Sequence, residues 1–409
     1  MRSSIGPEPT PPEPVPFVVF HRHELPGLVA RNGALALADV QPVGALAIRT
    51  PAGSFTYVPT DDTIEIVEGE EPARTVVAMD EDAFDGLVHD LETTPGLFYG
   101  GRVEVVRGNP LRFVRWEPAL RALFHGLPIY DPETIDLRDR HGGPLDPSRS
   151  FALDDLADRF DDVRDHFETA GYAHVRGVFT PDEVAGFLED AAVLRDEARE
   201  GDQESWWGRT ADGEAVLTRV LRAATRPRLR ALYDDARVQR IASVPATPLV
   251  AKHTEGCDAV TVLWKIPNVR EGLADLPWHR DCGMGGHARN CPAIVMTICL
   301  NDGSAAAGEL RVLPGSHRAS FPFVDGTDRA APRGVSIGVT AGDVTIHATD
   351  VMHASLPPTS EVGPHRISVL LDFVSPGAGH HRGGRHYNDV LLGADDGQVA
   401  HLADRVGRG

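Results

Sequence analysis

Two stretches in the second half of the chain decide the fold: LPWHRD at residues 276–281 and GDVTIHATDVMHAS at residues 342–355. In the first, His279 and Asp281 are two residues apart, so on a β-strand both side chains point to the same face. The second is a β-rich run that leads to a further histidine, His353. Two imidazoles and one carboxylate on a β scaffold are the ligands of the facial triad, which holds non-haem Fe(II) and leaves coordination positions open. The two stretches therefore predict a metal site on a β scaffold.

This prediction needs support, because an isolated H-x-D pair is more often surface decoration than a metal site. Arg366 supplies it, since it lies thirteen residues after His353 at the start of another β-rich run. A guanidinium on a neighbouring strand offers a fixed fork for the far carboxylate of a dicarboxylic acid. His347, six residues before His353, is the alternative third ligand in this stretch.

The scaffold itself is predicted from six β-rich runs separated by Gly and Pro turns. The runs are residues 259–266, 293–300, 309–313, 334–339, 343–348 and 366–374. Such a set is typical of a β-sandwich or a jelly-roll barrel. Helical patterns precede it, from Leu153 to about Glu200 and over residues 215–242. A short strand at 173–179 interrupts the first of them, and Thr180 then caps the helix that follows.

A smaller α+β unit comes before the barrel, because strand patterns and then helical patterns appear between residues 45 and 126. Its expected elements are four short strands within 45–79, a helix at 81–93, a strand at 101–108 and a helix at 117–126. The predicted organisation is a flexible proline-rich tail at 1–20, an α+β domain at 21–130, a linker at 131–152, the β-rich domain at 153–376 and a C-terminal extension at 377–409.

Composition and charge exclude several classes of protein. The 409 residues include 42% hydrophobic residues, which indicates a globular core, and the formal net charge of −20 argues against a nucleic-acid binder. No run approaches the ~18 uninterrupted apolar residues of a membrane helix, so no membrane span is expected. Four cysteines without a C-x-x-C pair are too few for a disulfide framework and favour a reducing, cytoplasmic location. No pattern bears on the oligomeric state.

Seven arginines between Arg219 and Arg240 allow two interpretations. They are a solvated helix face whose charges are paired with acids, or they hold an anionic group such as the pyrophosphate of coenzyme A. The first interpretation is the more common one for a series of this kind.

Five segments, in this order, resemble the phytanoyl-CoA dioxygenase-like branch of the Fe(II)/2-oxoglutarate oxygenases. They are FETAGYAHVRGVFTPDEVAGFLEDAAVLRDE at 167–197, WHRD at 278–281, GELRVLPGSH at 308–317, GDVTIHATDVMHAS at 342–355 and HRISVLLDF at 365–373. The resemblance extends over about residues 153–376. It implies a mainly-β catalytic domain with the double-stranded β-helix (jelly-roll, cupin-like) fold and flanking helices, behind the α+β N-terminal domain.

The resemblance implies that His279, Asp281 and His353 are the catalytic metal centre and bind Fe(II). In the family pattern the second histidine of the stretch is the ligand, which favours His353 over His347. Related halogenases have Gly or Ala in the place of Asp281, which leaves room for chloride on the iron. The carboxylate in this chain therefore implies transfer of oxygen from O₂.

The resemblance also implies which residues bind the co-substrate 2-oxoglutarate. Arg366 would pair with its C5 carboxylate, and Ser355 matches a serine that helps to hold that carboxylate. Lys265, in LWKIPN, matches a family lysine near the co-substrate; it is one of only two lysines among 40 basic residues, although chance survival is the alternative. Many family members have an S-x-x-N segment after the serine, whereas residues 355–366 read SLPPTSEVGPHR, a departure that removes neither group.

The implied activity is the oxidation of a C–H bond of a small or lipid-like substrate, acyl or carrier-linked, coupled to decarboxylation of 2-oxoglutarate. The front domain is more faintly similar to the sterol carrier protein 2 fold, which encloses lipids. A lipid-binding protein with an oxygenase-like scaffold is therefore one alternative. A cupin-like metal enzyme without 2-oxoglutarate is another, which Arg366 and Ser355 disfavour.

Overall fold

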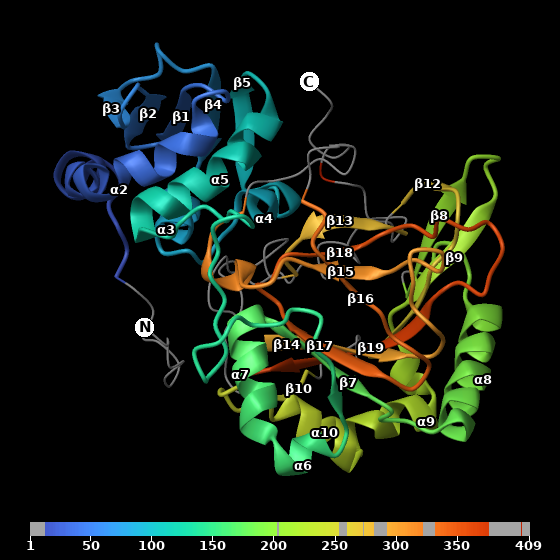
Figure 1. Ribbon diagram of the computed structural model, residues 1–409. Helices are drawn as coiled ribbons and strands as arrows, with labels where there is room; N and C mark the ends of the chain where they lie inside the picture. Colours follow the sequence, from blue (N-terminus) through green and yellow to red (C-terminus); the bar gives the residue numbers. More distant parts are fainter. Residues whose placement is uncertain are drawn as a thin grey trace.

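The computed structural model describes residues 13–202, 204–252, 260–272, 274–281, 293–321 and 332–375, together with Leu402. Figure 1 shows a front domain, in blue to cyan at the upper left, beside a larger β-rich domain in green to red. The front domain has a five-stranded sheet, and the larger domain has a ten-stranded and a four-stranded sheet. Within the described residues, none of the helices combines the length and apolar character that crossing a membrane requires.

The front domain is built on a sheet with the strand order β3-β2-β1-β4-β5. Neighbouring strands run antiparallel except for β1 and β4, which are parallel. The strands are β1 (Leu46–Thr50), β2 (Gly53–Pro59), β3 (Ile64–Glu68), β4 (Thr75–Met79) and β5 (Val103–Arg107). All five fall within the predicted ranges, which confirms the strand prediction for this domain.

Two long helices, α2 (Leu25–Val40) and α5 (Pro110–His125), pack against each other and contact this sheet. Two shorter helices, α3 (Glu81–Val88) and α4 (Thr94–Tyr99), connect β4 to β5. The start of α5 lies before the predicted residue 117, because Asn109 accepts a hydrogen bond from the Leu111 N–H and a proline occupies the first helical position. The prediction lacks α2, since its proline and two glycines weaken the helical pattern.

The last part of the predicted flexible tail at residues 1–20 is helical. Two short helical segments begin inside that range, α1 (Phe17–Val19) and the π-helical η1 (Phe20–Glu24). Phe17 and Phe20 are buried in the core of the front domain, where the ring of Phe17 meets that of Phe84 edge-on at 4.7 Å between centroids. The prediction is wrong for this part of the tail, because burying two aromatic rings offsets the conformational entropy lost on ordering.

The larger domain has two facing sheets (Figure 1). The ten-stranded sheet has the order β12-β8-β9-β11-β19-β14-β17-β7-β6 with β10 paired to β19, and the four-stranded sheet has the order β13-β18-β15-β16. The large sheet contains β6 (Phe151–Ala152), β7 (Tyr172–Arg176), β8 (Ser205–Thr210), β9 (Ala215–Val220), β10 (Val250–Ala251), β11 (Val260–Trp264), β12 (Val269–Glu271), β14 (Ala293–Cys299), β17 (Val344–Ala348) and β19 (Ile367–Val374). The small sheet contains β13 (Leu276–His279), β15 (Leu310–Val312), β16 (Val335–Ile337) and β18 (His353–Ser355). All six predicted runs form strands, and the expected double-stranded β-helix is confirmed.

The large sheet has an apolar face and a more polar one. On β19, Val369 and Leu371 belong to a core cluster that also contains residues of the flanking helices. Ser368 and Asp372 alternate with them and therefore point to the opposite face, toward the small sheet. His347 lies on the same face of β17, since its neighbour Ile346 is part of the apolar cluster. The polar face of this sheet thus lines the interior between the two sheets.

Helices flank the larger domain in the places predicted for residues 153–200. They are α6 (Asp155–Asp158), α7 (Phe160–Ala170) and α8 (Pro181–Glu197), followed later by α9 (Pro227–Arg230) and α10 (Ala236–Ala242). A capping box starts α8: Thr180 Oγ1 accepts the Glu183 N–H at 3.3 Å, and the Glu183 carboxylate accepts the Thr180 N–H at 2.8 Å. The predicted N-cap is confirmed.

The prediction of helix over residues 215–242 is wrong in its first part. β8 and β9 form an antiparallel hairpin, and β9 joins the large sheet by pairing with β11. Leucine, alanine and arginine favour a helix in isolation, but strand pairing and the burial of Leu217 and Val220 override that propensity.

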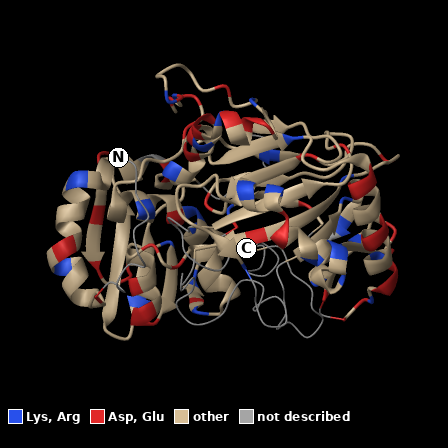
Figure 2. Cartoon of the chain, turned by 90° about the horizontal axis from the view of Figure 1, so that it is seen from below, with Lys and Arg blue, Asp and Glu red and all other residues tan. Residues whose placement is uncertain are grey.

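Several arginines of this segment are paired with acids. Arg237 lies 2.7 Å from Glu183, Arg228 lies 3.3 Å from Glu189, and Arg226 pairs with Glu197. Figure 2 shows the same mixture, with blue and red ribbon side by side on the helices at the right. These contacts favour the solvated, charge-paired helix face over a site for an anionic group.

The two domains are joined by the predicted linker and by the chain end. Just before the linker, Tyr130 donates its N–H to the Ser320 carbonyl oxygen at 2.6 Å and its hydroxyl to the Pro314 carbonyl oxygen at 3.0 Å. The last two residues of the predicted linker form β6. The predicted extension at 377–409 lies outside the described residues except for Leu402, which is buried against Tyr99 and Val114 of the front domain.

Replacing Thr180 by alanine should lower the free energy of unfolding by about 1 kcal/mol, because the N-cap hydroxyl is lost. Denaturant unfolding of the purified variant measures this change. Thr180→Ser keeps the hydroxyl and should stay close to the wild type. An equal loss in both variants would show that the capping box does not stabilise α8.

The stability of the front domain should depend on the charge of His21, which is buried and within 2.8 Å of the Tyr57 hydroxyl. Burial lowers the pKa of His21 to about 4 from its ordinary value of 6.5. The folded state therefore holds a neutral ring, and the unfolded chain takes up a proton first as the pH falls. Stability present above pH 6.5 should be lost between pH 6.5 and about 4, by up to about 1.4 kcal/mol per pH unit.

The measurement compares unfolding free energies near neutral pH and near pH 5 in wild type and His21→Gln. The difference between the two proteins should shrink as the pH falls. His23→Gln is the matched control, since His23 is exposed two residues away. A difference that is independent of pH would contradict the prediction.

Candidate active site

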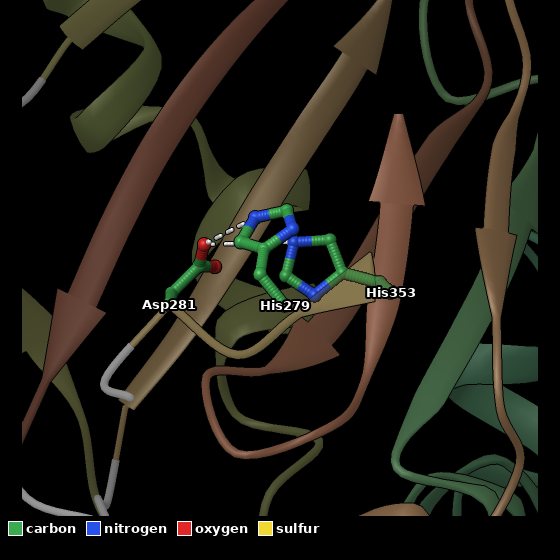
Figure 3. A group of neighbouring side chains, drawn as sticks. All are labelled: His279, Asp281 and His353. Carbon is green, nitrogen blue, oxygen red and sulfur yellow. Dashed lines mark ion pairs between the residues drawn. The ribbon is translucent and has the colours of Figure 1, made fainter. Parts of the chain in front are cut away.

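The two histidines expected to bind metal lie on neighbouring strands of the small sheet. β13 ends at His279, β18 begins at His353, and the antiparallel register sets these residues opposite each other. Their ring centroids are 4.2 Å apart. Paired residues on adjacent strands present their side chains to one face, so the sheet brings both imidazoles together (Figure 3).

Asp281 completes the group from the chain just after β13. One of its oxygens, Oδ1, is 3.4 Å from His279 Nε2 and 3.5 Å from His353 Nε2 (Figure 3). One ligand atom from each of the three residues lies within 4.8 Å of the others. Two imidazole nitrogens and a carboxylate oxygen at this spacing have the composition and convergence of a facial triad.

The second nitrogen of each ring fixes its orientation and protonation. His279 Nδ1 lies 2.7 Å from the Pro277 carbonyl oxygen, and His353 Nδ1 lies 3.0 Å from that of Val351. A carbonyl oxygen only accepts, so each Nδ1 carries a proton and donates it, and each Nε2 faces Asp281. His279 Nε2 is buried without a hydrogen-bond partner. A cation bound between these atoms would supply the missing partner, so the residues fit a metal ion.

His347 lies beside this group without belonging to it. Its Nε2 is 3.1 Å from Asp281 Oδ2, the carboxylate oxygen that does not face the other two rings. Burial lowers the pKa of His347 to about 4, so the neutral ring donates a hydrogen bond to that oxygen. This contact favours His353 over His347 as the third member of the triad and orients the carboxylate of Asp281.

The electrostatics of Asp281 suit a cation site. Burial raises the pKa of its carboxyl, but the charge of His353 and the hydrogen bond from His347 hold that pKa well below the ordinary value. Burial and the nearby His353 lower the pKa of His279. The group therefore offers an ionised carboxylate and an unprotonated imidazole, which are the states that bind a metal.

Arg366 and Ser355, the two residues expected to hold 2-oxoglutarate, contact each other directly. Arg366 Nη2 donates to Ser355 Oγ at 2.6 Å, and Arg366 Nε donates to the Gly308 carbonyl oxygen at 2.7 Å. Both side chains are buried. Ser355 lies two residues after His353 on β18, so both point to the same face of the small sheet. A guanidinium and a hydroxyl are thereby placed on the same face as the triad.

Lys265 lies under Ser355, with all three of its N–H donors in use. Its Nζ lies 2.6 Å from Asp275 Oδ1, 2.7 Å from the Ser355 carbonyl oxygen and 3.0 Å from the Ala274 carbonyl oxygen. Burial lowers the pKa of Lys265 to about 8, against the attraction of Asp275. These contacts place the lysine next to the predicted co-substrate residues and favour a role in holding Ser355 over direct contact with a ligand.

Two hydroxyl groups on the inner face of the large sheet have no hydrogen-bond partner among the described residues. They are Thr345 Oγ1 of β17 and Ser368 Oγ of β19, both fully or almost fully buried. Thr345 lies two residues before His347, and Ser368 lies two residues after Arg366, so these hydroxyls are candidate contacts for a polar ligand in this interior.

One site residue is absent from the sequence prediction. Arg280, the middle residue of H-x-D, pairs with Glu117 of the front domain at 2.8 Å. The H-R-D sequence contains a charge at this position, but nothing in it links that charge to a helix earlier in the chain. Only tertiary structure brings the two together.

Fold and site together define the class: a double-stranded β-helix protein whose two histidines and one aspartate converge as the ligands of a non-haem metal do. Residues 167–366 match the family model described as phytanoyl-CoA dioxygenase (PhyH). This segment is similar to the phytanoyl-CoA dioxygenase family, and the chain is a dioxygenase-like enzyme. No curated protein matches the chain.

Solved structures resemble about half of the chain. AviO1 from Streptomyces viridochromogenes Tue57 has 26% sequence identity over 54% of this chain and 96% of its own, with a TM-score of 0.42. SnoN, a non-haem α-ketoglutarate-dependent epimerase of nogalamycin biosynthesis, has 21% identity over 57% of this chain and 89% of its own, with a TM-score of 0.44. EctD from S. alaskensis, solved with 2-oxoglutarate and 5-hydroxyectoine, has 22% identity over 58% and 83%, with a TM-score of 0.41.

Replacing Lys265 by methionine should lower the free energy of unfolding by about 3–5 kcal/mol, because a buried ion pair loses one partner and two carbonyl oxygens lose a donor. Denaturant unfolding measures the loss. The matched control is Lys252→Met, which removes the other lysine of the chain, 3.9 Å from Asp372. Equal losses in the two variants would mean that the contacts of Lys265 stabilise the fold no more than those of Lys252.

Proposed function

We propose that the protein is an Fe(II)- and 2-oxoglutarate-dependent oxygenase that oxidises a C–H bond of a small molecule. His279, Asp281 and His353 would hold the iron, and Arg366 with Ser355 would hold the C5 carboxylate of 2-oxoglutarate. When bound, iron and 2-oxoglutarate supply the oxidising power with O₂. The observation that carries the proposal is the convergence of His279 Nε2, His353 Nε2 and Asp281 Oδ1, all within 4.8 Å of one another.

The chain's own residues would prepare this site in three ways. The carbonyl oxygens of Pro277 and Val351 keep Nδ1 of each imidazole protonated, which leaves Nε2 free for a metal. His347 holds the second oxygen of Asp281, so the carboxylate presents its first oxygen to the metal. Arg366 is oriented by Ser355 and Gly308 before any ligand arrives, and a preformed fork loses little freedom when a carboxylate binds.

Within this proposal the substrate is a polar small molecule rather than a lipid. Thr345, Ser368 and Asp372 give the inner face of the large sheet hydroxyl and carboxylate groups, where an acyl chain would need apolar contacts. Burial raises the pKa of Asp372, which lies near Asp281 and Arg219. A carboxylate in this position favours a substrate with hydroxyl or amino groups. The sterol-carrier-like ligand tunnel in the front domain remains a prediction.

The proposal includes a cytoplasmic location. Of the four cysteines, only Cys299 falls within the described residues, and it is a buried free thiol. A structural thiol of this kind suits a reducing compartment, in which Fe(II) also persists.

The test is an anaerobic titration of the purified protein with Fe(II) and 2-oxoglutarate, followed by visible absorption. A weak charge-transfer band should appear in the wild type, vanish in His279→Ala and weaken in Arg366→Ala, because the first variant loses a metal ligand and the second loses the carboxylate fork. His141→Ala is the matched control, since the side chain of His141 is 73% exposed. It should retain the band.

A second measurement identifies the substrate class. Succinate release in air is followed with two panels, one of polar hydroxylated or amino compounds and one of fatty acids and acyl thioesters. Stimulation by the polar panel is the expected result. Absence of the band at saturating Fe(II) and 2-oxoglutarate would instead point to the lipid-binding protein with a non-catalytic scaffold, and stimulation by acyl compounds alone would overturn the polar substrate.

A further inference from the structure

A buried ion pair joins the front domain to the segment that carries two of the triad residues. Glu117, in the middle of α5, has Oε1 2.8 Å from Nη2 of Arg280. Arg280 stands between His279 and Asp281 in the sequence. The two side chains are 12% and 7% exposed, so the pair is shielded from water and from salt.

Glu117 is itself held rigidly by the front domain. Its second oxygen, Oε2, accepts hydrogen bonds from the Thr94 N–H at 2.8 Å and the Thr94 hydroxyl at 3.0 Å. One helical turn further along α5, Arg121 donates two hydrogen bonds to Asp90, at 2.9 Å and 3.1 Å. Asp90 has a φ of 60°, a left-handed conformation that costs energy outside glycine and that this double hydrogen bond supports. The carboxylate of Glu117 is therefore fixed before it meets Arg280.

The same cluster adjoins the segment that carries the third triad residue. Asp350 lies in the turn between β17 and β18, three residues before His353, and is buried. Burial lowers the pKa of Arg280, and the negative charge of Asp350 opposes that effect. At Arg121 burial also acts to lower the pKa, but the charges of nearby carboxylates, Asp90 first and Asp350 among them, raise it above the ordinary value. Asp350 therefore lies close to guanidinium groups from both domains. Three carboxylates and two guanidinium groups thus form one buried cluster against both triad-bearing segments.

The Arg280 side chain points away from the triad, so the position of its partner Glu117 affects the orientation of His279 and Asp281. On an extended backbone, residue i+1 points away from residues i and i+2. Arg280 consequently points to the front domain while its two neighbours point to His353. If Glu117 is removed, the guanidinium of Arg280 loses its partner at 2.8 Å and shifts within the buried cluster, because a buried charge that loses a partner is costly in the interior. That movement would rotate this segment and turn His279 and Asp281 away from His353.

We propose that the front domain positions the metal centre, with Glu117 as the positioning residue that fixes Arg280 and through it His279 and Asp281. The inference rests on the proposed function, since it concerns the same metal site. It assigns to the front domain a task that does not require that domain to bind a ligand. Residues that orient metal ligands without touching the metal typically change metal affinity when they are replaced.

The experiment measures metal binding by the full-length protein with Co(II) as the probe, followed by its visible d–d absorption. In Glu117→Ala, and to a lesser degree in Glu117→Gln, the dissociation constant should rise by about tenfold to hundredfold and the Co(II) spectrum should change shape. Tyr130→Phe is the matched control: it removes a hydrogen bond at the same domain junction, to the Pro314 carbonyl oxygen, without touching Arg280. It should keep wild-type affinity and spectrum.

A double-mutant cycle tests whether the effect passes through Arg280. In the Arg280→Ala background, Glu117→Ala should weaken Co(II) binding by far less than in the wild type, since the two residues then act through a contact already lost. Equal effects in both backgrounds overturn the proposal. Wild-type affinity in folded Glu117→Ala and Glu117→Gln also overturns it, while the proposed function stands if His279→Ala still abolishes binding. A wild-type protein that binds no Co(II) overturns both.

Discussion

The antiparallel pairing of β13 with β18 is the constraint on which the site depends. Both strands are short, and only their register sets His279 opposite His353. The far edge of β18 is held as well, because Val312 of β15 pairs with His353 and Leu310 pairs with Ser355. A shift by one residue would turn each imidazole to the wrong face of the sheet. The small sheet thus fixes the register of His279 and His353, because β18 is paired with β13 on one side and with β15 on the other.

The hydrogen bond between Arg366 and Ser355 connects the large sheet to the small sheet beside the site. Arg366 directly precedes β19, the strand at the centre of the large sheet, and Ser355 ends β18 of the small sheet. Lys265, which directly follows the neighbouring strand β11, donates a hydrogen bond to the carbonyl oxygen of the same serine. Two donors from the large sheet's side therefore converge on one residue of the small sheet. The separation of the sheets near the site is set by these polar contacts in addition to apolar packing.

Sequence patterns predict the triad, Ser355 and Arg366 because each depends on local rules: alternation along a strand and the order of motifs in a chain. The same rules fail at β9, where leucine, alanine and arginine favour a helix and only pairing with β11 makes a strand. They also fail at Glu117 and Arg280, which are 163 residues apart. Neither residue has a local feature that indicates its partner, and the family resemblance covers only one of the two.

The ion pair between α5 and the H-R-D segment also limits how the two domains can be separated or exchanged. A truncated chain that begins at residue 151 would lack the front domain and would expose the guanidinium of Arg280, which is buried in the full chain. If the front domain were joined to an unrelated barrel, the buried carboxylate of Glu117 would lose the pairing with Arg280. Recombination at this junction would therefore yield chimeras with one mismatched charge on each side.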